Sequence, residues 1–265
     1  MTRNFWWGDF TAREFENLDP QRTVAVLPLA AIEQHGPHLP VSTDFAIMNA
    51  MLETLFAVLP KKIDVRFLPV QAVGKSNEHL YQPGTLTLPA ALLIAQWSEL
   101  GASVARAGVR KLVLLNSHGG NEEVIGIVAR EMRVQHKMLA VKTSWMRFGL
   151  PDGLYSEREK NFGIHGGDVE TSLMLHFHPE LVEMEKAQNF HSRAVDARSK
   201  FKHLAHTGTH AFAWIARDLN AQGAVGEAAK ASARKGRLTA AHQAKGFVEL
   251  LQDVSTARLD QWLAD

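Results

Sequence analysis

The chain of 265 residues contains no cysteine. Without thiols it can form no disulfide, it has no thiolate ligand for a metal, and it has no cysteine nucleophile. Any metal site must therefore use nitrogen and oxygen ligands. Histidine occurs 13 times, so the histidines are the residues to follow in the search for a site.

Long apolar stretches and an excess of charge of one sign are absent too. No stretch approaches the length that spans a bilayer, and the N-terminus, MTRNFWWGDF, lacks the charged and apolar regions of a secretory signal. We therefore expect a cytoplasmic protein with no membrane partner. The 29 Lys and Arg residues balance 28 Asp and Glu residues, for a formal charge of +1. The chain thus lacks the excess of basic residues that is typical of nucleic-acid-binding proteins, and the balance favours a small, neutral or mildly charged substrate.

Short aliphatic runs alternate with longer stretches of helical periodicity. The pattern predicts buried strands at 23–29, 65–70, 111–116 and 138–144, and helices at 45–59, 90–107 and, alone or as a pair, 225–254. Such alternation is typical of an α/β fold with a mostly parallel sheet and helices on both faces. The basic segment 191–210 is interpreted as an irregular edge element. No repeat or linker divides the chain, so a single domain is expected over residues 1–265.

The first polar cluster directly follows the first predicted strand. Glu33 and His35 are two positions apart, so in extended backbone their side chains point to the same side. Asp44, at the start of the next helix, can return to the same point. Any one of the three could be a solvated loop residue or a helix cap. Three ionisable groups placed together are costly for stability, however, and predict a centre for two metal ions.

The second cluster, NSHGGN at 116–121, follows the strand at 111–116. His118 is its candidate ligand, and Asn116 or Asn121 could hold that histidine through hydrogen bonds. The paired glycines Gly119 and Gly120 allow a ligand to approach the backbone closely. The alternative is an ordinary turn with an incidental histidine.

The third cluster, HGGDVETS at 165–172, leads into an apolar helix. Glu170 offers the further carboxylate that a two-metal site needs, although near a helix start it could serve the helix dipole alone. His165 could act as general acid or base, or stabilise a tetrahedral oxyanion.

These motifs together resemble the creatininase (creatinine amidohydrolase) family. The resemblance rests on EQHGPHLP at 33–40 with TD at 43–44, NSHGGN at 116–121, HGGDVETS at 165–172, and GKSNEH at 74–79 followed by PGT at 83–85. Their order and spacing also match, and the resemblance covers roughly residues 20 to 230.

The resemblance implies a three-layer α/β/α sandwich that carries two divalent metal ions, Zn, Mn or Fe. It implies metal ligands at five positions, with Asp44 bridging, and a catalytic histidine at His165. The five ligand positions are Glu33, His35, Asp44, His118 and Glu170. It also implies a homo-oligomer, such as a hexamer built as a trimer of dimers.

Two departures from creatininase itself bear on the substrate. Gly120 stands where creatininase has a metal-binding glutamate, which transfers that role to Glu170. Asn161 stands where creatininase has a tryptophan that packs on its substrate, so creatinine is not the expected substrate. We predict that His79, Trp145, Gly119 and Gly120 contact the substrate, although Trp145 could equally be a core residue. For His38 and His79, orientation of a ligand and contact with substrate are both open.

We expect a metal-dependent amidohydrolase that opens a small cyclic amide, such as a lactam, a cyclic imide or a creatinine-like ring, through a hydroxide that bridges the metal ions. A formamide deformylase or a peptide-trimming hydrolase of the same family is the nearest alternative. A non-catalytic metal-binding protein would not need His165. A phosphoesterase would be expected to show more Arg or Lys beside the motifs than Lys75.

Overall fold

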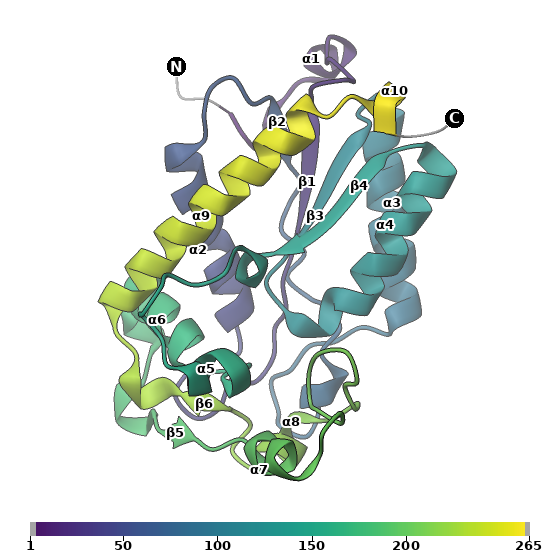
Figure 1. Cartoon of the computed structure of the whole chain (residues 1–265). Helices are drawn as coiled ribbons and strands as arrows, with labels where there is room; N and C mark the ends of the chain where they lie inside the picture. Colours follow the sequence, from purple (N-terminus) through teal and green to yellow (C-terminus); the bar gives the residue numbers. More distant parts are fainter. Residues whose placement is uncertain (1–3, 263–265) are drawn as a thin grey trace.

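A four-stranded parallel sheet forms the centre of the molecule (Figure 1). The structure is a computed structural model that describes residues 4–262. The strand order is β2-β1-β3-β4, and the strands are β1 (Val24–Leu29), β2 (Val65–Phe67), β3 (Lys111–Asn116) and β4 (Leu139–Ser144). Every residue of β1 and β3 is buried, which explains why both read as continuous apolar runs: central parallel strands are covered on both faces.

Helices cover both faces of the sheet (Figure 1). On one face lie α2 (Thr43–Val58), α6 (Asp168–Phe177) and α9 (Ala233–Thr256), and on the other lie α3 (Ala90–Arg106) and α4 (Glu122–His136). Successive strand residues alternate between two cores: Val24 and Val26 pack toward the first group, Ala25 and Leu27 toward the second. The predicted three-layer α/β/α architecture is therefore confirmed.

Shorter elements surround these layers. They are α1 (Ala12–Glu16), α5 (Glu157–Phe162), α7 (Arg193–Lys200), α8 (Ala216–Leu219) and α10 (Leu259–Trp262), with β5 (Asn189–Phe190) and β6 (Gly226–Glu227) paired as an antiparallel ribbon. The short 3-10 turns η2 (Asn77–His79), η3 (Gly119–Asn121) and η4 (Trp145–Phe148) lie in loops near the site described below. Within residues 4–262, no helix is long and apolar enough to cross a membrane.

Most element boundaries agree with the sequence pattern, and the exceptions have local causes. The predicted helix at 225–254 begins only at Ala233, because Gly226 has a φ of +134° and joins the β5–β6 ribbon, and because the Ser232 hydroxyl caps α9 by accepting from Lys235 N. The edge strand β2 ends at Phe67 instead of residue 70. The basic segment 191–210, expected to be irregular, contains α7.

Candidate metal centre

The loop after β1 brings the first two candidate ligands to the carboxyl edge of the sheet. Glu33 N donates to Val41 O at 2.8 Å, and Gly36, with a φ of +74°, turns the chain between Glu33 and Val41. The His35 ring donates from Nδ1 to Glu33 O at 3.0 Å. That hydrogen bond leaves His35 Nε2 free to face the interior of the site.

Asp44 lies in the first turn of α2 and returns to the same point, as its spacing predicts. Its Oδ1 lies 3.7 Å from His35 Nε2, and its Oδ2 lies 3.6 Å from His118 Nδ1. The two carboxylate oxygens of Asp44 thus face two different histidines. This is the arrangement that a bridging carboxylate requires.

His118 comes from the carboxyl end of β3. Its Nδ1 lies 3.1 Å from Glu33 Oε1, and its Nε2 lies 2.9 Å from Lys75 O. The carbonyl can only accept, so Nε2 carries the proton and Nδ1 is the nitrogen that faces the carboxylates. Asn116 holds the main chain of this motif and Asn121 holds Asn116, rather than the imidazole: Asn116 Oδ1 accepts from His118 N and from Asn121 Nδ2, each at 3.1 Å.

The third motif contributes Glu170 and His165 from the start of α6 and the loop before it. Glu170 Oε2 lies 3.8 Å from His35 Nε2 and accepts from Gly166 N at 2.5 Å. His165 Nδ1 lies 3.6 Å from Glu33 Oε1, while its Nε2 donates to Gln34 O at 2.7 Å. All five predicted ligands and the predicted catalytic histidine therefore lie in one cluster.

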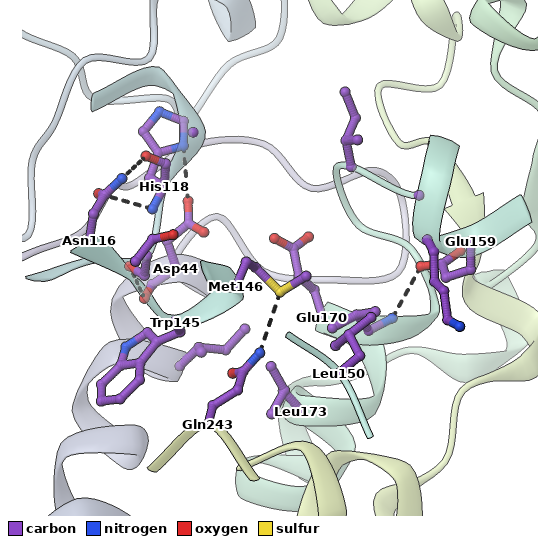
Figure 2. Close-up of a pocket in the computed structure, with 18 of the residues that line it drawn as sticks. Asp44, Asn116, His118, Trp145, Met146, Leu150, Glu159, Glu170, Leu173 and Gln243 are labelled. Carbon is purple, nitrogen blue, oxygen red and sulfur yellow. Dashed lines mark hydrogen bonds and ion pairs between the residues drawn. The ribbon is translucent and has the colours of Figure 1, made fainter. Parts of the chain in front are cut away.

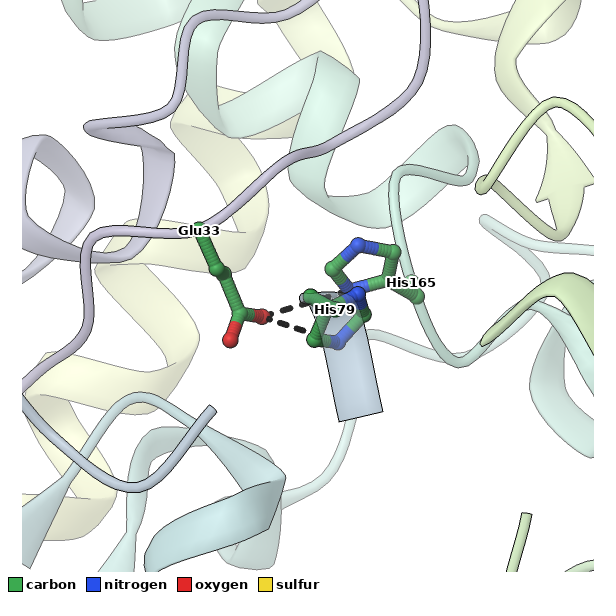
Figure 3. Close-up of side chains that lie close together, drawn as sticks. All are labelled: Glu33, His79 and His165. Carbon is green, nitrogen blue, oxygen red and sulfur yellow. Dashed lines mark ion pairs between the residues drawn. The ribbon is translucent and has the colours of Figure 1, made fainter. Parts of the chain in front are cut away.

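His79 belongs to the same cluster, and His38 does not. The His79 ring stacks on His165 with centroids 4.3 Å apart, and its Nε2 lies 3.4 Å from Glu33 Oε1 (Figure 3). Gln34 Nε2 donates to His79 Nδ1 at 2.7 Å. His38 instead contacts Thr171 Oγ1 through Nε2 at 2.9 Å. Its contact ties the first motif to the helix turn that carries Glu170.

A cavity of about 290 Å³ opens beside Asp44, His118 and Glu170 (Figure 2). Much of its remaining wall is apolar, with contributions from Ile47, Leu150, Val169 and Leu173. Of the four residues predicted to contact substrate, Trp145 and Gly119 line this cavity, whereas His79 and Gly120 are not among its lining residues. Trp145 also packs against Phe247 with ring centroids 5.3 Å apart, so it is at once a core residue and a wall of the cavity.

Several polar atoms that face the interior of the cluster lack a hydrogen-bond partner. Within residues 4–262, Glu33 Oε1 and Oε2, His35 Nε2 and Asp44 Oδ2 are buried and accept or donate no hydrogen bond. Burial raises the pKa of Asp44 well above its usual value, and the neighbouring Glu33 raises it further. Burial likewise raises the pKa of Glu170. Several carboxylates buried together are expensive unless cations neutralise them.

The pKa values of His118 and His165 are shifted in opposite directions. Burial opposes protonation of His118, but Glu33, Asp44 and Glu78 together outweigh burial and raise the pKa of His118 to about 10. Burial, with His35 beside it, lowers the pKa of His165 to about 4. Among the residues that the structure describes, four overlapping sets of three residues have nitrogen or oxygen ligand atoms within 4.8 Å of one another. The donor set therefore suits divalent cations such as zinc or manganese.

Sequence reasoning did not single out Glu78 or Gln34, which also reach the cluster. Glu78 Oε1 lies 3.6 Å from His118 Nε2, and Gln34 contacts both His79 and His165. Both residues stand inside quoted motifs, GKSNEH and EQHGPHLP, next to a candidate histidine. Their position in these motifs could have identified them as candidate site residues.

Known proteins that are similar to this chain indicate its family. The chain is 30% identical over 175 residues to the mycofactocin precursor peptide peptidase of Mycolicibacterium smegmatis, an alignment that covers 65% of this chain and 64%, or less than two thirds, of that relative. It is 31% identical over 202 residues to the creatinine amidohydrolase of Pseudomonas putida, covering 70% of this chain and 76% of that one.

A solved structure named "Creatininase Mn" shares the fold, with a TM-score of 0.72 at 24% identity, over 95% of this chain and 98% of that chain. The family model described as "Creatininase: Creatinine amidohydrolase" matches residues 8–251. The chain therefore belongs to the creatininase family.

Proposed function

We propose that the protein is a metal-dependent hydrolase that cleaves a carbon–nitrogen bond, other than a peptide bond, in a small cyclic amide. One observation carries the proposal: buried, unpartnered ligand atoms of Glu33, His35 and Asp44 converge beside a cavity of about 290 Å³. Buried carboxylate oxygens and imidazole nitrogens without hydrogen-bond partners are suited to bind divalent cations.

Five residues would hold two divalent cations. Glu33 and His118 would share one ion and His35 and Glu170 the other, with Asp44 between them, because its two oxygens face His118 and His35 respectively. The chemistry that two such ions supply is polarisation of a carbonyl and activation of water at neutral pH. The name of the structural neighbour "Creatininase Mn" supports manganese as one of the metals to test.

His165 is the residue that would move a proton. Its Nε2–H is committed to Gln34 O, so Nδ1, 3.6 Å from Glu33 Oε1, is the nitrogen that can take up a proton at the cluster. Burial lowers the pKa of His165, so the ring is neutral at pH 7 and Nδ1 carries a lone pair that could take up a proton from the attacking water. It can then return the proton to the departing nitrogen of the substrate.

The cavity supports a small substrate. A volume of about 290 Å³ lies near the lower end of small-molecule sites, and its apolar wall suits the carbon skeleton of a ring. Trp145 and Gly119 would contact that ring. Peptide hydrolysis is the second candidate, because the relative from Mycolicibacterium smegmatis is named a precursor peptide peptidase. A formamide is the third class to test, as another small amide.

The experiment is a substrate panel on zinc- and manganese-loaded protein, followed by NMR of the products. The panel contains cyclic amides (hydantoin, succinimide, 2-pyrrolidinone and creatinine), N-formyl amino acids, and short peptides. We expect the wild type to open the ring of at least one cyclic amide and His165→Ala to have lost this activity. Hydrolysis of peptides alone would replace the cyclic-amide proposal with the second candidate.

We further propose a cytoplasmic homo-oligomer, a hexamer by the family resemblance. Light scattering on the purified protein tests the assembly, and a monomer at all concentrations would contradict it.

A further inference from the structure

Three oxygen atoms from one loop surround the outer nitrogen of His118. Lys75 O lies 2.9 Å, Ser76 Oγ 3.3 Å and Glu78 Oε1 3.6 Å from His118 Nε2. The other ring nitrogen, Nδ1, faces Glu33 and Asp44. The loop therefore lies on the side of the ring opposite the carboxylates.

Glu78 differs from the other two oxygens because it is charged. Its side chain is 17% exposed, so it stands between the buried cluster and solvent. A carboxylate that faces the N–H of a metal-binding histidine fixes the ring orientation and increases the electron density on the other nitrogen. Neutral oxygens supply orientation with a smaller effect on basicity.

Gly120 leaves the space that Glu78 occupies. A Cβ at position 120 would lie 2.4 Å from Glu78 Oε1, 2.5 Å from His118 Nε2 and 2.2 Å from Lys75 O. Gly119, one position earlier, has nothing within 4 Å of such a Cβ. The two glycines of the NSHGGN motif thus differ in the space around them. Only at position 120 would a side chain collide with Glu78, the residue that faces His118.

We propose that Glu78 is a positioning residue for the metal centre. The Nε2–H of His118 donates to Lys75 O, and the Glu78 carboxylate adds negative charge beside the same nitrogen, which favours the ring orientation in which Nδ1 faces the ions. Glu78, Glu33 and His118 have donor atoms within 4.8 Å of one another, but we assign Glu78 to positioning and not to ligation, because its carboxylate lies on the Nε2 side of the ring. The inference rests on the proposed function, since it requires that His118 binds metal.

The test measures zinc binding, independently of any substrate. Metal-free wild type and variants are titrated with zinc against a competing chelator, and bound zinc is counted by plasma mass spectrometry. Glu78→Gln keeps the shape and removes the charge. It should keep the wild-type number of ions but bind zinc about 10- to 100-fold more weakly, and Glu78→Asp should recover part of the affinity.

Matched controls separate this effect from general damage. Ser76→Ala removes a neutral oxygen at the same nitrogen, and Glu123→Gln removes a carboxylate from an exposed residue of α4. Both should bind zinc within about threefold of wild type. Gly120→Ala should weaken zinc binding and Gly119→Ala should not. The thermal midpoint of each metal-free variant reports whether it folds.

Two outcomes would overturn the inference alone: Glu78→Gln with unchanged zinc affinity, or Glu78→Gln with one ion fewer, which would make Glu78 a ligand. Wild-type protein that binds no zinc would overturn the proposed function, and this inference with it. The wild-type titration therefore tells the two failures apart.

Discussion

Glu159 is a buried carboxylate that holds together the elements around Glu170. Glu159 is only 1% exposed. Oε1 accepts from Val169 N at 3.2 Å, at the start of α6, and Oε2 accepts from Glu227 N in β6 at 2.7 Å. Burial, only partly offset by these hydrogen bonds, raises the pKa of Glu159 from 4.5 to about 7.

This shift predicts how the free energy of unfolding depends on pH. The folded state binds the proton more tightly than the unfolded state, so the contribution of Glu159 to stability is smallest above about pH 7, where both states are ionised. The contribution grows as the pH falls toward about 4.5 and is then constant. At about 1.4 kcal/mol for each pKa unit, the gain is on the order of 3 kcal/mol.

Urea unfolding of metal-free protein at about pH 8 and about pH 5 measures this gain. Glu159→Gln has a similar shape but does not titrate, so its change in unfolding free energy between the two pH values should be smaller than that of wild type by on the order of 3 kcal/mol. Glu157→Gln is the matched control, because that side chain lies on the same helix and is 80% exposed. Equal pH dependence in wild type and Glu159→Gln would refute the reasoning.

Two further substitutions test packing beside the site. Gly236→Ala should destabilise the protein by about 1–3 kcal/mol, although alanine favours helices, because a Cβ there would lie 1.9 Å from Ser172 O on α6; a rise in the thermal midpoint would contradict this. Trp145→Ala should cost about 3–5 kcal/mol, because Trp145 is 3% exposed and packs on Phe247. It should also raise the KM for any cyclic amide that is hydrolysed; an unchanged KM would remove Trp145 from the substrate site.

The sheet and its polar edge were predictable because their signals are local. The run at β1 is apolar throughout and that at β3 is apolar from 112 to 115, and a parallel arrangement places the residues that follow them at one edge. Glu33, Asp44 and His118 accordingly meet there. The single-domain organisation and the metal ligation by these residues remain predictions.

Other features depend on distances that no local pattern contains. The role proposed for Glu78 depends on its distance from His118 and on the lack of room for a side chain at Gly120, and both positions are far from Glu78 in sequence. The start of α9 is set by the pairing of β6 with β5. The ring of His79 stacks on His165 beside Glu33 and is not among the residues that line the cavity, so its contact with substrate remains a prediction.

The metal content of purified protein tests the central claim most directly. Wild type and Glu33→Ala are purified without chelator, incubated with zinc or manganese, desalted, and measured by plasma mass spectrometry. We predict about two divalent ions per wild-type chain and one or none in Glu33→Ala, because Glu33 contributes two unpartnered buried oxygens to the cluster. Wild-type protein without bound metal after reconstitution would contradict the account.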